Sequence, residues 1–158
     1  IIVTYDGRKQ KDFGFIMDRV VMVQNGERMD RERISISATV EEDFSHLTAE
    51  ERARAPKVNF VNTEHNFGNV KSGVVIKHDF EFKNTGKSDL HIRKVRASCG
   101  CTPTNPEKML IKPGETSKIG MSFNTTGRKG NQHKTITVIT NDPDNPSTVL
   151  RVRGMIED

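Results

Sequence analysis

The 158-residue sequence contains no tryptophan, one tyrosine and only two cysteines. Because aromatic side chains are so few, a hydrophobic core must be built mainly from Val, Ile, Leu, Phe and Met. No apolar run approaches the roughly 18–20 residues that a membrane-spanning helix needs, so we expect no membrane span. Two cysteines exclude the multiple-disulfide framework of small secreted domains. The length suits one ordinary domain, or a small domain with part of another.

Charged residues make up 29% of the chain, and its formal net charge is +4. The lysines and arginines are scattered and alternate with apolar residues, as in Leu150-Arg151-Val152-Arg153. Such alternation is typical of strands with one solvated face. We therefore interpret the basic charge as strand surface and expect no nucleic-acid partner.

An internal repeat organises the chain. Three segments among the first 43 residues have apolar residues at the same positions as three segments near the C-terminus. The longest of these alignments has no gap and an offset of 116 positions. The paired segments are 1–5 with 119–123, 20–25 with 136–141, and 25–42 with 141–158. Residues 1–43 are therefore predicted to be three strands that form the C-terminal part of an immunoglobulin-like repeat.

Residues 44–57 predict a linker that contains a short helix, from about residue 48 to residue 55. Thr48-Ala49-Glu50-Glu51 fits a capping box, in which the threonine hydroxyl and the Glu51 carboxylate accept free backbone N–H groups at the helix start. Pro56 ends any such helix, because proline lacks the backbone donor.

Residues 58–158 contain seven short segments with strand character, separated by turn signals about every 8–12 residues. In the second segment Ile76, His78, Phe80 and Phe82 share one face. The polar residues 97–108 predict a long loop. The seven segments are 58–61, 74–83, 90–95, 109–111, 118–123, 135–140 and 149–156. This pattern predicts an all-β chain with a complete immunoglobulin-like β-sandwich of about seven strands over residues 58–158.

Several short motifs occur together in this second region. They are Phe82-Lys83-Asn84-Thr85-Gly86, Ser98-Cys99-Gly100-Cys101-Thr102, Ile111-Lys112-Pro113-Gly114-Glu115, Gly127-Arg128-Lys129-Gly130 and Thr140-Asn141-Asp142-Pro143. With these motifs, residues 58–157 resemble an exported bacterial family of domains of unknown function, which has an immunoglobulin-like sandwich and is related to hydin-type and major-sperm-protein-type domains. The resemblance implies export to the periplasm or cell envelope, tandem copies, and no established activity. No signal peptide is seen, and the sequence opens in the middle of an apolar pattern, so a targeting segment would lie upstream.

Cys99 and Cys101, separated by Gly100, are the pair with candidate chemistry. Two thiolates could hold Cu(I) or Zn(II), with Met109 and a histidine completing the site. The same pair could cycle through a strained disulfide. Alternatively, Gly100 lets the loop turn while the cysteines only pack or pin it. Among the histidines, His78 is expected to be buried and neutral, and the surface or edge positions are His65, His91 and His133.

The sequence contains no catalytic nucleophile arrangement, phosphate-binding loop or motif-placed carboxylate pair, so we expect no enzyme and no cofactor. The favoured function is a non-catalytic interaction or spacer domain of the bacterial cell envelope, with an unidentified protein partner. The alternative is a metal-binding or redox-responsive envelope protein that acts through Cys99 and Cys101. The candidate interaction loops contain Ser98, Gly100, Thr102, Arg128 and Lys129.

Three strands alone leave an apolar face and a sheet edge unpaired. We therefore expect residues 1–43 to be completed by another structure. The docked second domain, a homodimer through the partial repeat, and an upstream segment are three ways to complete them.

Overall fold

A computed structural model of the chain describes residues 5–6, 9, 12–98 and 100–157, with the side chains of residues 30 and 32 excepted. The chain divides into two compact units, residues 1–42 and residues 43–158. Among the described residues, no helix is long and apolar enough to cross a bilayer.

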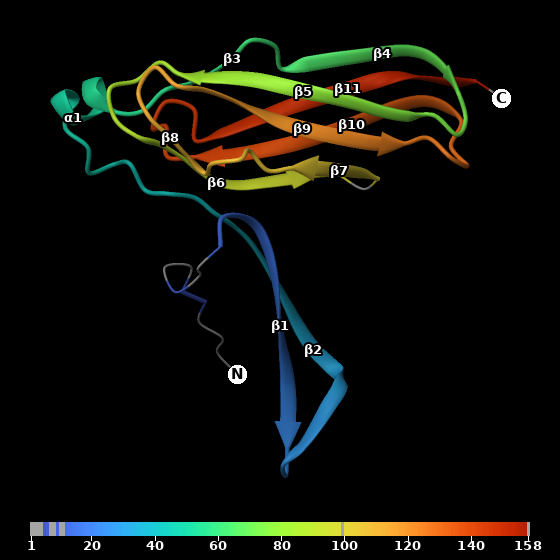
Figure 1. Cartoon of the computed structure of the whole chain (residues 1–158). Helices are drawn as coiled ribbons and strands as arrows, with labels where there is room; N and C mark the ends of the chain where they lie inside the picture. The colour runs from blue at the N-terminus through green and yellow to red at the C-terminus, as the bar shows by residue number, and fades with distance from the viewer. Residues whose placement is uncertain (1–4, 7–8, 10–11, 99, 158) are drawn as a thin grey trace. The chain divides into compact units, whose positions relative to one another are not determined.

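Residues 43–158 contain two sheets whose inner faces form one core (Figure 1). The first sheet has the order β4-β11-β10-β6-β8, formed by Glu64–Lys71, Ser147–Glu157, Gly130–Thr140, Leu90–Ala97 and Leu110–Ile111. The second has the order β3-β5-β9-β7, formed by Val58–Phe60, Val75–Asn84, Thr116–Asn124 and Cys101–Thr104. The predicted immunoglobulin-like β-sandwich is confirmed.

The core consists of the apolar positions that alternate along the strands. Phe80 and Phe82 of β5 are each 1% exposed, as their shared face predicts. Along β5 and β9 the more buried side chains alternate with more exposed ones, because successive side chains point to opposite faces of a sheet. The core residues that are at most 1% exposed come from both sheets: Phe80, Phe82, Leu90, Ile111, Ile119, Phe123, Ile136, Val138, Leu150 and Val152.

Two strands have no counterpart in the sequence prediction. Strand β7 lies within the segment 97–108, for which a loop was the expectation, and it pairs with β9 at the edge of its sheet. It contains Pro103, which an edge strand tolerates because one of its sides makes no ladder. Strand β4 contains Asn66, Gly68 and Asn69, which are poor strand formers, and it pairs in parallel with β11.

Strand β6 contains a register irregularity at Arg93. Its register against β10 shifts between Ile139 and Thr140, where Thr140 faces Ile92 and Ile139 faces Lys94. Arg93 is the additional residue between these two pairs. It forms a β-bulge, which changes the face on which the following side chains lie.

The predicted linker helix is also present, as α1, Ala49–Arg54. The Thr48 side chain accepts the backbone N–H of Glu51, and the Glu51 side chain accepts that of Thr48, so both halves of the capping box form.

The described part of residues 1–42 contains one antiparallel hairpin of β1, Gly14–Gln24, and β2, Glu27–Val40. Asn25 and Gly26 form its turn with φ of 52° and 84°, as the tight turns of twisted hairpins require. Of the third strand predicted at residues 1–5, all but Tyr5 lies outside the described residues, and that strand stays a prediction.

Candidate functional site

The motifs lie in the turns at the two ends of the sandwich. At the linker end, where residues 55–58 enter the sandwich, the turns are 85–89, 112–115 and 141–146. At the opposite end, called the distal end, the turns are 72–74, 98–100 and 125–129. Figure 1 shows α1 beside the loops of the linker end. The two ends offer different chemistry, and we consider each as a candidate site.

Asp142 is the central buried group of the linker end. Its side chain is fully buried, and its Oδ2 accepts the backbone N–H of Val58 at 2.9 Å. Its Oδ1 accepts the N–H groups of Asp144 and Asn145 at 2.9 and 3.2 Å. One carboxyl group therefore shapes its own turn and holds the first residue of β3.

Asn84, which is also fully buried, holds the next part of the linker end. Its Oδ1 accepts the N–H groups of Lys57 and Gly86 at 3.3 and 3.0 Å. Its Nδ2 donates to the carbonyl oxygens of Ser88 and Ile111, both at 2.9 Å. The Asn-Thr-Gly motif thus joins the linker, its own turn and β8 through one amide.

Two surface ion pairs add to this contact between the linker and the sandwich. Arg52 of α1 donates from Nη1 to the Pro143 carbonyl and to Asp144 Oδ1, both at 3.2 Å, and Lys57 Nζ lies 3.3 Å from Asp144 Oδ2. The hydrogen bonds from Arg52 and then from Lys57 lower the pKa of the Asp144 carboxyl. Residues 52–58 are therefore attached to the 141–146 turn by buried and exposed contacts together.

At the distal end, two of the predicted interaction loops meet. The turn 98–100 joins the two sheets: Ser98 exchanges hydrogen bonds with Thr135, and its carbonyl accepts the N–H of Cys101 at 3.3 Å. The guanidinium of Arg128 lies against Gly100, at the place that a Cβ atom there would occupy. The turns that contain Gly100 and Arg128 are thus in contact.

The two remaining residues of the predicted loops flank this contact. Thr102 is exposed on β7, where it pairs with Ser122, and Lys129 is exposed beside Arg128. The Lys129 carbonyl accepts the Gln132 side chain at 2.9 Å. The role of these five loop residues in binding stays a proposal.

The described cysteine of the pair, Cys101, is a half-buried free thiol opposite Phe123. Arg128 Cζ and Lys134 Nζ lie 5.3 and 5.4 Å from the Phe123 ring centroid. Burial raises the pKa of the Cys101 thiol, and the nearby charges of Lys134 and Arg128 oppose this rise. The thiolate, which is the reactive and metal-binding form, is therefore disfavoured at neutral pH.

We expect Cys101 in a Cys99→Ser variant to be alkylated at pH 7 about tenfold or more slowly than in the unfolded chain, because burial favours the thiol. The pH dependence of the alkylation rate measures this pKa. Lys134→Met removes an opposing charge and should raise the pKa further, whereas the outward-facing control Lys77→Met should not change it. Alkylation as fast as in the unfolded chain would contradict the expectation.

The metal-site hypothesis receives one correction. Cys99 lies outside the described residues, so the cysteine pair itself stays untested. Met109, the third ligand considered, is at the linker end, where its carbonyl accepts the N–H of Ile92. Residues 92–97 of β6 separate it from the turn at Cys101 by roughly 17 Å at the usual rise of a strand. Met109 therefore cannot join Cys101 in one site.

Within the described part of the chain, no three His, Cys, Asp or Glu side chains gather in a way that could hold a metal ion.

Sequence reasoning missed a contact between His65 and His78. The two rings stack with centroids 3.8 Å apart and planes 10° apart, and Phe80 meets His78 edge-on at 4.7 Å. The pKa of His65 is lowered by burial and by His78. His78 is half-buried, as its apolar face suggests, and its packing partner His65 lies on β4, an edge strand, as predicted. No sequence signal joins them, because they lie on strands of different sheets.

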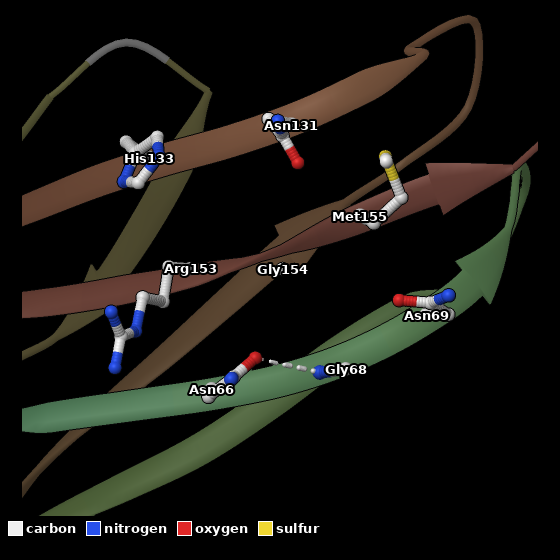
Figure 2. Close-up of a pocket in the computed structure, with 8 residues that line it drawn as sticks. All are labelled: Asn66, Gly68, Asn69, Asn131, His133, Arg153, Gly154 and Met155. Atoms are coloured by element: carbon white, nitrogen blue, oxygen red, sulfur yellow. Dashed lines mark hydrogen bonds between the residues drawn. The ribbon is translucent and has the colours of Figure 1, made fainter.

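A shallow groove of about 380 Å³ lies on the outer side of the sheet formed by β4, β11 and β10 (Figure 2). Polar side chains line most of it: Asn66, Asn69, Asn131, His133 and Arg153, beside Gly68, Gly154 and Met155. Several of these groups already have partners. Asn66 accepts the N–H of Gly68, Asn69 donates to Glu157, and Arg153 lies 3.7 Å from Glu64. The groove has no aromatic platform of Phe, Tyr or Trp, and its chemistry does not single out a ligand.

The architecture defines a class of protein: an immunoglobulin-like β-sandwich whose end loops hold the preceding linker. Residues 58–156 match the family model described as protein of unknown function, DUF1573, and the chain belongs to this family. The predicted resemblance to a family of unknown function is thereby confirmed, while its relation to hydin-type and major-sperm-protein-type domains stays a prediction. No curated protein sequence matches the chain.

Solved structures share the fold. A protein of unknown function from Porphyromonas gingivalis W83 is 21% identical with a TM-score of 0.69, over 93% of this chain and 68% of that one. The secreted serine protease VesC from Vibrio cholerae is 13% identical with a TM-score of 0.52, over 69% of this chain and 24% of that one. The VesB protease of the same species is 11% identical with a TM-score of 0.50, over 66% of this chain and 32% of that one. This chain thus spans less than a third of either protease, and the likeness concerns the fold alone.

Proposed function

We propose that this protein is a non-catalytic interaction and spacer module of the bacterial cell envelope. The proposal rests on one observation: the two ends of the sandwich differ, since one end holds the linker and the other carries basic loops. The linker end uses the buried side chains of Asp142 and Asn84 to hold residues 57 and 58. Such a joint suits a spacer, because it keeps the entering chain in a defined position on the sandwich. The envelope location rests on the family resemblance.

The distal end is the proposed surface for a protein partner. There the turns 98–100 and 125–129 bring together Gly100 and the basic side chains of Arg128 and Lys129. Loops at the end of a rigid sandwich are common binding positions, because the sheets hold them in place. Basic side chains at such a surface favour a partner with an acidic patch, through complementary charge.

Neutralisation of the distal end tests this assignment. A partner captured from envelope extract and then purified should bind the Arg128→Gln, Lys129→Gln variant about tenfold or more weakly, with most of the loss in association rate at low salt. The control Lys77→Gln, Lys83→Gln removes the same charge from the outer side of β5. Thermal melting verifies that both variants are folded. Equal binding by both variants would remove the distal end from the proposal.

A further inference from the structure

The N-terminal hairpin and the last hairpin of the sandwich have the same strand register. In the first, eight consecutive pairs run from Gly14↔Val40 to Val21↔Arg33. In the second, the corresponding pairs run from Gly130↔Ile156 to Thr137↔Val149. Both members of every pair are displaced by 116 positions, which is the offset of the sequence repeat. Registers of separate hairpins have no reason to agree in this way unless the hairpins are equivalent elements.

The start of each hairpin agrees as well. Gly14 and Gly130 each open the first strand with a positive φ, 81° and 70° respectively. A residue other than glycine rarely adopts this conformation. The two hairpins diverge only after Val21, where β1 and β2 have a register shift before their tight turn.

One face of the N-terminal hairpin is apolar at the positions that are core positions in the sandwich. In β10 and β11 the residues Ile136, Leu150, Val152 and Ile156 are at most 2% exposed, because the sheet of β5 and β9 covers them. Their counterparts by register are Val20, Ile34, Ile36 and Val40. Of these, Val20 is 38% and Ile34 is 44% exposed. Within the described part of residues 1–42, no further strand covers this face.

We infer that the hairpin 14–40 is the last pair of strands of a second sandwich of the same fold, and that its apolar face is covered by the opposing sheet of that sandwich. The equivalent hairpin in this chain shows what that cover is: a sheet like β3-β5-β9-β7, carrying large apolar residues such as Phe80, Ile119 and Phe123. An isolated two-stranded hairpin is at best marginally stable in water, so the cover also supplies the stability that β1 and β2 lack alone.

The covering sheet is inferred to lie on the same polypeptide, outside residues 1–158. In the complete domain, the strands that cover the last hairpin come before it in the chain. The likeness to the Porphyromonas gingivalis protein includes 93% of this chain, more than residues 43–158 alone can supply, and it leaves about a third of that protein unmatched. The hairpin would be covered in this way whether or not the distal end binds a partner.

Hydrogen exchange of the residues 14–40 tests the inference in two proteins, the 158-residue chain and the full-length polypeptide that contains it. The hairpin amides should exchange roughly a hundredfold or more slowly in the full-length polypeptide than in the 158-residue chain, with both proteins monomeric by light scattering. Slow exchange in the monomeric 158-residue chain would overturn the inference, since residues 43–158 would then be the cover. Slow exchange that appears only on dimerisation would assign the cover to a second copy. Fast exchange in both proteins would mean that nothing covers the hairpin.

Thiol labelling compares the accessibility of the two faces of the hairpin, and the cysteine substitutions that it needs place no charged side chain on either face. Ile36 corresponds to the buried Val152, and its neighbour Ser37 corresponds to the outward-facing Arg153. In the full-length polypeptide, the thiol introduced by Ile36→Cys should react about tenfold or more slowly than the thiol introduced by Ser37→Cys. In the 158-residue chain the two rates should be similar. Equal rates in the full-length polypeptide would overturn the assignment of the covered face.

Discussion

Replacement of Asp142 by alanine is expected to lower the free energy of unfolding of the sandwich by about 3–5 kcal/mol. The carboxyl group is fully buried and accepts three backbone N–H groups, those of Val58, Asp144 and Asn145. Alanine leaves these donors without their acceptor, and the donor of Val58 is itself buried. A buried donor that loses its acceptor costs more than the net value of the hydrogen bond, because no water replaces it. Chemical denaturation followed by circular dichroism measures the loss.

Two further variants make this prediction specific. Asp142→Asn keeps one acceptor oxygen and places an amide group where the second oxygen was, so its loss should be smaller than that of alanine. Asp144→Ala removes the exposed ion pairs to Arg52 and Lys57 and should cost far less, since solvent screens surface pairs. If Asp144→Ala destabilised the domain as much as Asp142→Ala, the surface ion pairs would hold the linker end as strongly as the buried carboxyl, which would contradict the prediction.

Gly86→Ala is expected to be the second severe substitution, with a loss of about 3 kcal/mol or more from overpacking and from broken hydrogen bonds. A Cβ atom at this position would lie 2.5 Å from Lys57 N and 2.6 Å from the carbonyl carbon of Pro56, and still closer to the carbonyl oxygen of Ala55. These are backbone atoms, so no side-chain rotation relieves the contact. The linker must move, and the bonds from Thr85 N to Lys57 O and from Lys87 N to Ala55 O must lengthen.

Thermal melting should show a midpoint about 10 °C or more below that of the wild type. The matched control is Lys87→Ala, which trims an exposed side chain in the same turn and should leave the midpoint nearly unchanged. Limited proteolysis adds a local readout, because a displaced linker should be cleaved faster around residues 52–57. A wild-type midpoint for Gly86→Ala would show that the linker does not pack against this turn in solution.

Most of the fold was predictable because strands that bury one face carry a strong local signal. The alternation through Ile76, Phe80 and Phe82 placed β5 and its inner face, and the capping box placed α1 within one residue at each end. Strands β4 and β7 escaped prediction for a common reason: their local sequences contain glycine, asparagine or proline, and only pairing with β11 and β9 makes them extended.

The sequence predicted several residues of the candidate sites but not the contacts between them. The Asn-Asp-Pro motif was visible in the sequence, but the hydrogen bond from the Val58 N–H to the Asp142 carboxyl joins residues 84 positions apart. The loops at Gly100 and Arg128 were both proposed as binding loops, and only the fold shows that the guanidinium lies against the glycine. The stacking of His65 on His78 depends in the same way on two sheets meeting.

By itself, the sequence determined the all-β class, the turns, the linker helix and the repeat at an offset of 116 positions, because each depends on local periodicity or on residues close in the chain. The tertiary structure alone decided which turns share an end, that Asp142 and Asn84 are buried acceptors, and that β1 and β2 repeat the register of β10 and β11. These features depend on contacts between distant segments, whose positions follow from the packing of two sheets. The scarcity of aromatic residues and cysteines thus matches a protein stabilised by an aliphatic and phenylalanine core and by buried turn hydrogen bonds.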